Sequence, residues 1–189
     1  HVKLGSRQHS QTFDAIEEAH HADQAFGNFC IKLNNFLNLL LPSSNILLPE
    51  GKHIHLQGTY EITEHHFIHI NYESMVDWHQ HTDYLHCNPL FFGSLHFNCV
   101  FIQQTENKVI LSRLLFCFEC LVGDHRLPLA LIHPFDTPTA QFYSVRSIIC
   151  GAFLVPDGPS NYLVVDTADT DMFLHMKMMH LEAGHIVHI

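Results

Sequence analysis

Apolar side chains recur every three or four positions between residues 12 and 41, which is the period of an amphipathic helix. Thr12 can cap the start of this helix, Gly27 can interrupt it, and Pro42 ends it because proline cannot continue the helical hydrogen bonding. Two prolines and Ser43-Ser44-Asn45 predict a loop over residues 41–51. We therefore divide the chain into an N-terminal helical segment and loop over residues 1–50 and a β-rich domain over residues 51–189.

After this loop the period of the pattern changes to two. Ile62, Ile68 and Ile70 fall on one face of an extended segment, and polar residues alternate with them. Further strands are predicted at residues 97–103, 108–122, 127–133, 142–149, 152–155 and 162–165. A short C-terminal helix is predicted after Asp169 or Thr170. Because no helices intervene between the strands, we expect a mainly β (α+β) fold, an antiparallel barrel or sandwich packed by the N-terminal amphipathic helix and the short C-terminal helix.

Composition narrows the classes of partner. Nine Lys and Arg stand against nineteen Asp and Glu, a formal net charge of −10, which argues against a phosphate-binding surface at neutral pH. The nineteen histidines would reverse the sign of the net charge on protonation below a pH of about 6.5. No apolar run is long enough to cross a bilayer, and the six cysteines have no disulfide-scaffold spacing. We expect an intracellular domain with buried free thiols and without a membrane partner.

Two small clusters have spacings that occur in metal or redox sites. Cys117 and Cys120 can form a zinc or redox pair on a turn, but here they lie within a strand-like run, where residues three apart point to opposite faces. Two packed thiols are the simpler interpretation. Asp166, Asp169 and Asp171 can be drawn as a divalent-metal cluster, yet the same stretch is also a helix start before an apolar helix face. That face is formed by Met172, Phe173, Met176 and Met179.

Histidine pairs and aromatic residues provide the other candidate sites. His53 and His55 share a face of an extended segment, and Glu61 follows at an interval similar to the first metal motif of cupins. The second half of that motif is not found, so surface imidazoles are the alternative interpretation. An aromatic cage for methylated lysine can be drawn from four residues that equally suit a core. They are Trp78, Tyr84, Phe91 and Phe92. Nucleophile elbows, phosphate-binding glycine loops and dinucleotide fingerprints do not occur.

Several longer segments resemble predicted basidiomycete fungal proteins encoded in or beside Plavaka-type, CACTA-like DNA transposons. The resemblance spans most of the chain. It is carried by Gly5-Ser6-Arg7-Gln8, Tyr72-Glu73-Ser74-Met75-Val76-Asp77-Trp78, Thr82-Asp83-Tyr84-Leu85-His86-Cys87-Asn88-Pro89, Arg113-Leu114-Leu115-Phe116, Ala130-Leu131-Ile132-His133-Pro134-Phe135-Asp136, Val145-Arg146-Ser147-Ile148-Ile149, Asp166-Thr167 and Asp171-Met172-Phe173-Leu174.

The resemblance implies a β-rich accessory region of a nuclear, transposon-derived protein, without catalytic residues or a cofactor. Its partners would be DNA, chromatin or other transposon proteins. Four histidines stand where such relatives tend to have arginine, which suggests a degenerate basic surface. The nucleic-acid-binding residues expected on this basis are His69, His79, His86, Arg113, Arg146 and His175. A cupin-like metal-binding protein that uses His53, His55 and Glu61, and a structural domain without retained activity, remain the alternatives.

Overall fold

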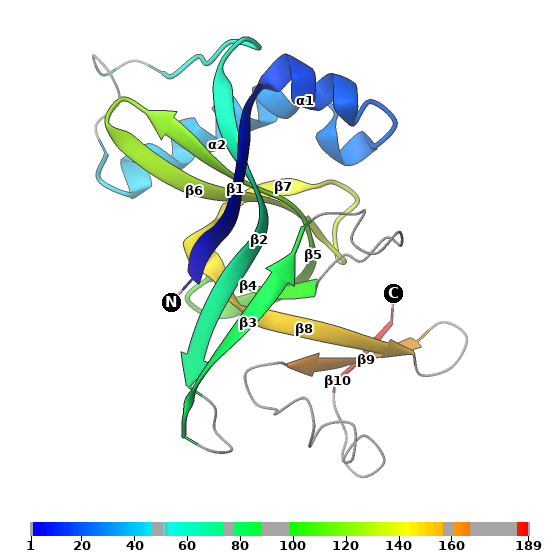
Figure 1. Ribbon diagram of the computed structural model, residues 1–189. Coiled ribbons are helices and arrows are strands. Elements are labelled where there is room, and N and C mark those ends of the chain that lie inside the picture. The colour runs from blue at the N-terminus through cyan, green and yellow to red at the C-terminus, as the bar shows by residue number, and fades with distance from the viewer. Residues whose placement is uncertain are drawn as a thin grey trace.

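The computed structural model describes residues 2–46, 51, 53–73, 78–87, 99–156, 161–166 and 185–188, and their fold is mainly β (Figure 1). Two α-helices, α1 (Phe13–Ala19) and α2 (Phe29–Ser43), accompany ten antiparallel strands in this part of the chain. The strands are β1 (Val2–Thr12), β2 (Glu61–Glu73), β3 (Gln80–His86), β4 (Cys99–Thr105), β5 (Lys108–Val122), β6 (His125–Pro134), β7 (Gln141–Ser144), β8 (Ile148–Pro156), β9 (Asn161–Asp166) and β10 (His185–His188).

The sheet forks at β2 and is not closed into a barrel. Its order is β1-β2-β5-β4-β8-β9-β10, with β3 beside β2, β6 beside β5, and β7 beside β6. One edge of β2 pairs with β1, and the opposite edge pairs first with β5, at residues 63–65, and then with β3, at residues 67–73. Because β3 and β5 share one edge of β2, the sheet divides there into two limbs, one formed by β2 with β3 and the other continuing through β5. The expected antiparallel, mainly β character is confirmed. Of the two expected forms, the closed barrel is wrong, and the sandwich stays a prediction.

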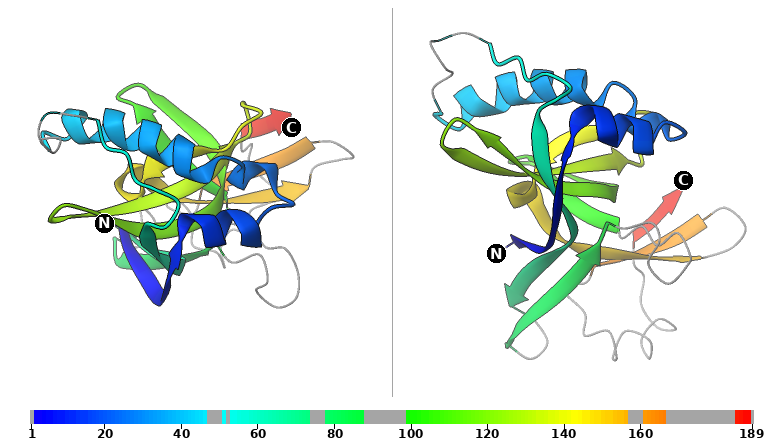
Figure 2. Two further views of the ribbon diagram at one scale, coloured as in Figure 1. Left: turned by 90° about the horizontal axis from the view of Figure 1, so that it is seen from above. Right: turned by 45° about the horizontal axis from the view of Figure 1, so that its top comes forward.

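The hairpin of β5 and β6 separates two hydrophobic clusters. Phe118 and Leu131 face α1 and α2, whereas Leu114 and Ile132 face the opposite side of the hairpin, where the β2–β3 limb contributes Ile68. A register shift between Leu114 and Phe116 accommodates the bend of β5. Figure 2 shows both helices on the same side of this hairpin. Apolar residues therefore fill both faces of β5 and β6, which explains the nearly continuous hydrophobic run in this part of the sequence.

The N-terminal segment departs from the predicted single helix. Thr12 does cap a helix, because its side-chain oxygen accepts a hydrogen bond from the Ala15 amide, but α1 ends at Ala19. A short 3₁₀-helix, η1 (Gln24–Phe26), and a left-handed Asn28 with φ 56° precede α2. The interruption that the sequence allowed at Gly27 is present, and it extends over residues 20–28 between α1 and α2. Residues 2–12 were not expected to be extended, and they form β1 along β2.

Two asparagines of α2 hold residues 53–57 against the helix. The side-chain amide of Asn34 donates to the Leu56 carbonyl at 2.9 Å and accepts from the Leu56 amide at 2.7 Å. Asn38, one turn later, makes the same pair of bonds to Ile54, also at 2.9 and 2.7 Å. These four hydrogen bonds form a ladder that satisfies the backbone N–H and C=O groups of Ile54 and Leu56, which pair with no strand in the described part of the chain. The side chains of Ile54 and Leu56 can therefore pack into the hydrophobic cluster beneath α1 and α2.

The predicted hairpins around Thr105-Glu106-Asn107 and after Gly123 are confirmed. Strand β3 was not predicted, and the C-terminal helix expected after Asp169 lies outside the described residues. Within the described ranges, no helix has the length and apolar character needed to span a membrane.

Candidate functional site

Residues of helix α2 fall on four faces, each repeated every fourth residue, and two of these faces line a surface groove. Phe29, Leu33, Leu37 and Leu41 are fully buried in the core. Asn34 and Asn38 form the ladder, and Ile31, Asn35 and Leu39 point outward, with 62% of Ile31 and 75% of Leu39 exposed. The remaining face, Lys32, Phe36 and Leu40, borders a groove of about 680 Å³, which Asn35 and Leu39 of the outward face also line. The amphipathic pattern of the sequence contains all four faces, because residues four apart lie on one side of a helix.

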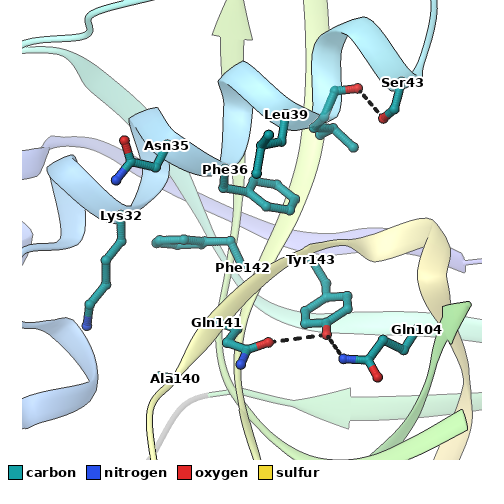
Figure 3. A pocket seen from close by; sticks show the side chains of 11 residues that line it. Lys32, Asn35, Phe36, Leu39, Ser43, Gln104, Ala140, Gln141, Phe142 and Tyr143 are labelled. Carbon is teal, nitrogen blue, oxygen red and sulfur yellow. Dashed lines mark hydrogen bonds between the residues drawn. The ribbon is translucent and has the colours of Figure 1, made fainter. Parts of the chain in front are cut away.

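Figure 3 shows this groove between α2 and β7. The rings of Phe36 and Phe142 are 6.1 Å apart between centroids and form its apolar floor and wall. The opposite bank is polar. Gln104 at the end of β4 donates a hydrogen bond to the Tyr143 hydroxyl at 3.1 Å, and that hydroxyl lies 3.3 Å from the Gln141 side-chain oxygen and donates to it. The groove is therefore apolar toward the helix and rich in hydrogen-bonding groups toward β4.

The groove follows the edge of β7 rather than one of its faces. Four consecutive residues, 140–143, line it. Because successive side chains of a strand point to opposite faces, a groove touched by consecutive residues must lie alongside the strand. The pairing agrees, since β7 is hydrogen-bonded to β6 on one side, and in the described part of the sheet no strand pairs with its other side. The free edge of β7 is thus one wall of the groove.

Charge in the groove is confined to one cation. Lys32 is the single charged side chain among the eleven lining residues, and its ammonium group donates to the Ala25 carbonyl at 3.4 Å. Lys32 also lines an adjoining cavity of about 470 Å³ that continues the groove past Ala140. None of the eleven residues carries a carboxylate, an imidazole or a thiol. The lining is suited to binding by shape, apolar contact and hydrogen bonds.

The proposed cupin-like ligands do not form a metal site. His53 and His55 share the outward face of residues 53–57, as predicted, and both are exposed, while Glu61 begins β2. Among the described residues, no group of three or more His, Cys, Asp or Glu side chains is placed to hold a metal ion. Asp166 ends β9, and Asp169 and Asp171 lie outside the described ranges together with the methionines that follow them.

The expected nucleic-acid-binding residues are brought together only in part. His69 of β2 and His86 of β3 both lie against Phe67, with ring centroids 4.9 and 5.7 Å from it. Gly5 of β1 makes room for this cluster, because a Cβ atom there would overlap the rings of His69 and Phe67. His79 lies just before β3.

The two arginines lie on other elements, and one histidine is not described. Arg113 is on β5, with its guanidinium 5.2 Å from the Phe135 ring centroid, and Arg146 is in the 3₁₀-helix η4 (Val145–Ser147) between β7 and β8. His175 is outside the described residues. A shared surface for all six side chains stays a prediction.

The proposed aromatic cage is described only in part. Trp78 is 72% exposed, and the Tyr84 ring lies tilted against those of Phe67 and His69, at 6.0 and 4.7 Å between ring centroids. Phe91 and Phe92 lie outside the described ranges. The Tyr84 ring therefore contacts neighbouring rings rather than lining a cavity for a cation.

Cys117 and Cys120 point to opposite faces of β5, as predicted, because they belong to different hydrophobic clusters. Burial raises the pKa of Cys120 to about 12 and raises the pKa of Cys117 well above the usual value for a thiol. No sequence pattern predicted that the Cys87 thiol, just after β3, would contact the Cys117 thiol. Both lie where β3 and β5 meet on β2. Such protonated, enclosed thiols are suited to packing rather than nucleophilic chemistry.

His65 is a buried imidazole at the fork of the sheet. Its Nδ1 lies 3.2 Å from the Gly5 carbonyl oxygen, and since a carbonyl can only accept, Nδ1 carries the proton. The Nε2 atom is buried and has no hydrogen-bond partner among the residues that the structure describes. Burial lowers the pKa of His65 below its usual value, against the opposing effects of the Gly5 carbonyl and Glu119, while Arg7 adds to the lowering. The native protein therefore favours neutral His65.

We expect the free energy of unfolding to decrease as the pH falls below about 6.5, the usual pKa of histidine in an unfolded chain. The folded-state pKa of His65 is lower, so protons bind the unfolded chain first, and stability is lost until the pH passes the folded-state pKa. Urea titrations between a pH of about 7.5 and 5 will measure this loss. His65→Asn keeps a donor for Gly5 and should flatten the profile relative to the exposed control His125→Asn. An equally steep profile in both variants would assign the acid sensitivity to other groups.

No family model, curated protein or solved structure matches the chain.

Proposed function

We propose that this chain is a non-catalytic interaction module that binds a peptide segment of a partner protein in the groove between α2 and β7. The observation that carries this proposal is the combination of a strongly exposed Leu39 with an apolar groove beside it. Clustered exposed apolar side chains rimmed by polar groups are typical of protein interaction sites. Gln104, Gln141 and Tyr143 supply such a rim.

The chemistry of the lining supports binding rather than catalysis. General acid–base or nucleophilic catalysis requires carboxylate, imidazole, thiol or activated hydroxyl groups in reach of a substrate. The groove offers phenyl rings, leucines and side-chain amides, together with the Lys32 ammonium group. Its two hydroxyls are engaged, that of Tyr143 by Gln104 and Gln141 and that of Ser43 by the Leu40 carbonyl. These groups recognise apolar side chains and peptide bonds.

The resemblance to transposon-encoded accessory regions supports a further part of the proposal, namely that this module works in a nuclear multiprotein assembly. The net charge of −10 favours a protein partner over direct contact with DNA phosphates at neutral pH. His69 and His86, which share a surface around Phe67, remain the part of the chain where a nucleic-acid contact is proposed.

A displayed library of random-sequence peptides, selected on the folded protein, tests the proposed function. Full burial of a leucine contributes about 1.5–3 kcal/mol, so Leu39→Asp should weaken the selected peptides by about tenfold or more. Val109→Asp is the matched control, because Val109 is also exposed, at 49%, but lies on β5 away from the groove lining. Thermal unfolding of both variants checks that each is folded.

Peptides that bind the native protein, lose binding with Leu39→Asp and retain it with Val109→Asp are the expected result. A selection that yields no binder, or only binders indifferent to Leu39→Asp, would overturn the assignment of the groove.

A further inference from the structure

We infer that the bound segment is an extended peptide that adds to the free edge of β7 as a further strand, with an acidic residue beside Lys32. This inference rests on the proposed function and specifies the conformation and chemistry of the partner. It excludes a helical ligand lying in the groove and a second copy of this chain packed on the α2 surface.

The unpaired edge of β7 provides the backbone recognition. Residues 141–144 pair with residues 132–129 of β6 through one edge. In an antiparallel pair, successive residues direct their N–H and C=O groups alternately toward and away from the neighbour. Two of the four β7 residues therefore direct both backbone groups into the groove, either residues 141 and 143 or residues 142 and 144. An extended peptide can pair with these groups whatever its side chains are.

The two banks of the groove determine which side chains fit. A strand added about 4.8 Å from β7 directs alternate side chains toward α2 and toward β4. The residues toward α2 meet Phe36, Leu40 and Phe142, so an apolar side chain is required there. The residues toward β4 meet the hydrogen-bonded pair of Gln104 and Tyr143, which suits threonine, serine or asparagine. The preferred partner thus alternates apolar and hydrogen-bonding residues.

Lys32 fixes the position of the acidic residue. It is the one charged side chain of the lining, at the junction with the adjoining cavity near Ala140. The chain as a whole is negative, so a strongly acidic ligand would be repelled at long range, and a single carboxylate at this end is the better match. An exposed ion pair of this kind adds about 0.2–1 kcal/mol, so it determines register and direction more than affinity.

The alternatives fit the described surface less well. A helix in the groove would bury apolar residues at every third or fourth position but would leave the free N–H and C=O groups of β7 without peptide partners. A second copy seated on the outward face of α2 would have only one helix of fifteen residues as its contact. Stable dimers bury about 800 Å² on each partner, more than one short helix face provides.

The experiment uses two synthetic probes, acetyl-Asp-Thr-Leu-Thr-Leu-Thr-amide and the same residues in reversed order, titrated into the full chain to about 5 mM and followed by NMR. We expect shifts of the Leu39 and Leu40 methyl groups with at least one probe. At saturation, amide hydrogen exchange should slow about fivefold or more at alternate β7 residues, with the others unchanged. N-methylation of alternate peptide residues should abolish binding, and N-methylation of the intervening residues should leave it intact.

Lys32→Ala should lower the affinity of the aspartate probe about two- to fivefold and leave its asparagine counterpart unaffected. Methyl shifts without alternate protection of β7 amides would overturn strand addition and leave the interaction function in place. No shift with either probe would also overturn strand addition, and the library selection with Leu39→Asp then shows independently whether the groove binds peptides at all.

Discussion

Replacing Phe29 with alanine should lower the free energy of unfolding by about 3–5 kcal/mol, the usual cost of emptying a phenylalanine site in a packed core. Phe29 is completely buried at the first residue of α2. Its ring centroid lies between 5.0 and 6.1 Å from those of five other phenylalanines, contributed by α1, η1, β5 and β7. Loss of this ring removes the contact that joins the helices to the hairpin. Urea denaturation will measure the change, with an unaltered m-value if the native fold is kept.

Phe36→Ala is the matched control for Phe29→Ala. Phe36 is partly buried, and its ring lies near Phe142 at the groove rather than at the centre of the cluster. We expect a loss of about 1–2 kcal/mol, because less apolar area is removed from contact. Equal losses in the two variants would show that the cluster has no central residue. The same variant also tests function, because Phe36 lines the groove and Phe36→Ala should weaken peptide binding there.

Asn34→Ala should cost about 2–4 kcal/mol, since it removes both hydrogen bonds to Leu56 and leaves a shielded backbone N–H and C=O without partners. Asn38→Ala removes the equivalent bonds to Ile54 and should act in the same direction. The loss should exceed the gain of about 0.5 kcal/mol expected from the better helix propensity of alanine. Chemical denaturation measures the loss, and hydrogen exchange at the Leu56 amide reports its cause.

Asn35→Ala separates the effect of losing the ladder hydrogen bonds from the effect of the higher helix propensity of alanine. Asn35 is exposed on the same helix and makes no ladder bond to residues 53–57. The substitution should therefore raise the free energy of unfolding by about 0.5 kcal/mol, whereas Asn34→Ala should lower it. If Asn34→Ala and Asn35→Ala gave the same small change, the segment at residues 53–57 would be held by its apolar side chains alone.

Local sequence patterns predicted the strands and helices that bury one face and expose the other. The alternation of Ile62, Ile68 and Ile70 predicted β2, and turn residues such as Thr105-Glu106-Asn107 predicted the hairpins. Strands β1 and β3 were missed because most of their residues are polar, with apolar contacts confined to Val2 and Leu4 in β1 and Leu85 in β3, and their extended form depends on pairing with β2. The barrel was predicted wrongly because alternation shows which face of a strand is buried but not which strands share an edge.

The candidate site was less accessible to sequence reasoning than the fold. Phe36 and Leu40 were assigned to a helix face correctly, but an apolar helix face is ordinarily core, and nothing local places a groove beside it. The other wall is a strand edge, and whether an edge is free depends on pairing across the whole sheet. The Cys87 contact with Cys117 has the same origin, since it arises where two limbs of the sheet meet.

The four faces of α2 also bear on how this protein can change over evolution. Positions that hold the core and positions that hold residues 53–57 by hydrogen bonds are separate from the exposed Ile31, Asn35 and Leu39. Substitutions at the outward positions therefore alter the surface offered to a partner at little thermodynamic cost, because surface changes usually stay within about 0.5 kcal/mol. A lineage can diverge in partner choice through these three positions while the scaffold remains the same. They are also where a designer would begin to give the domain a new specificity.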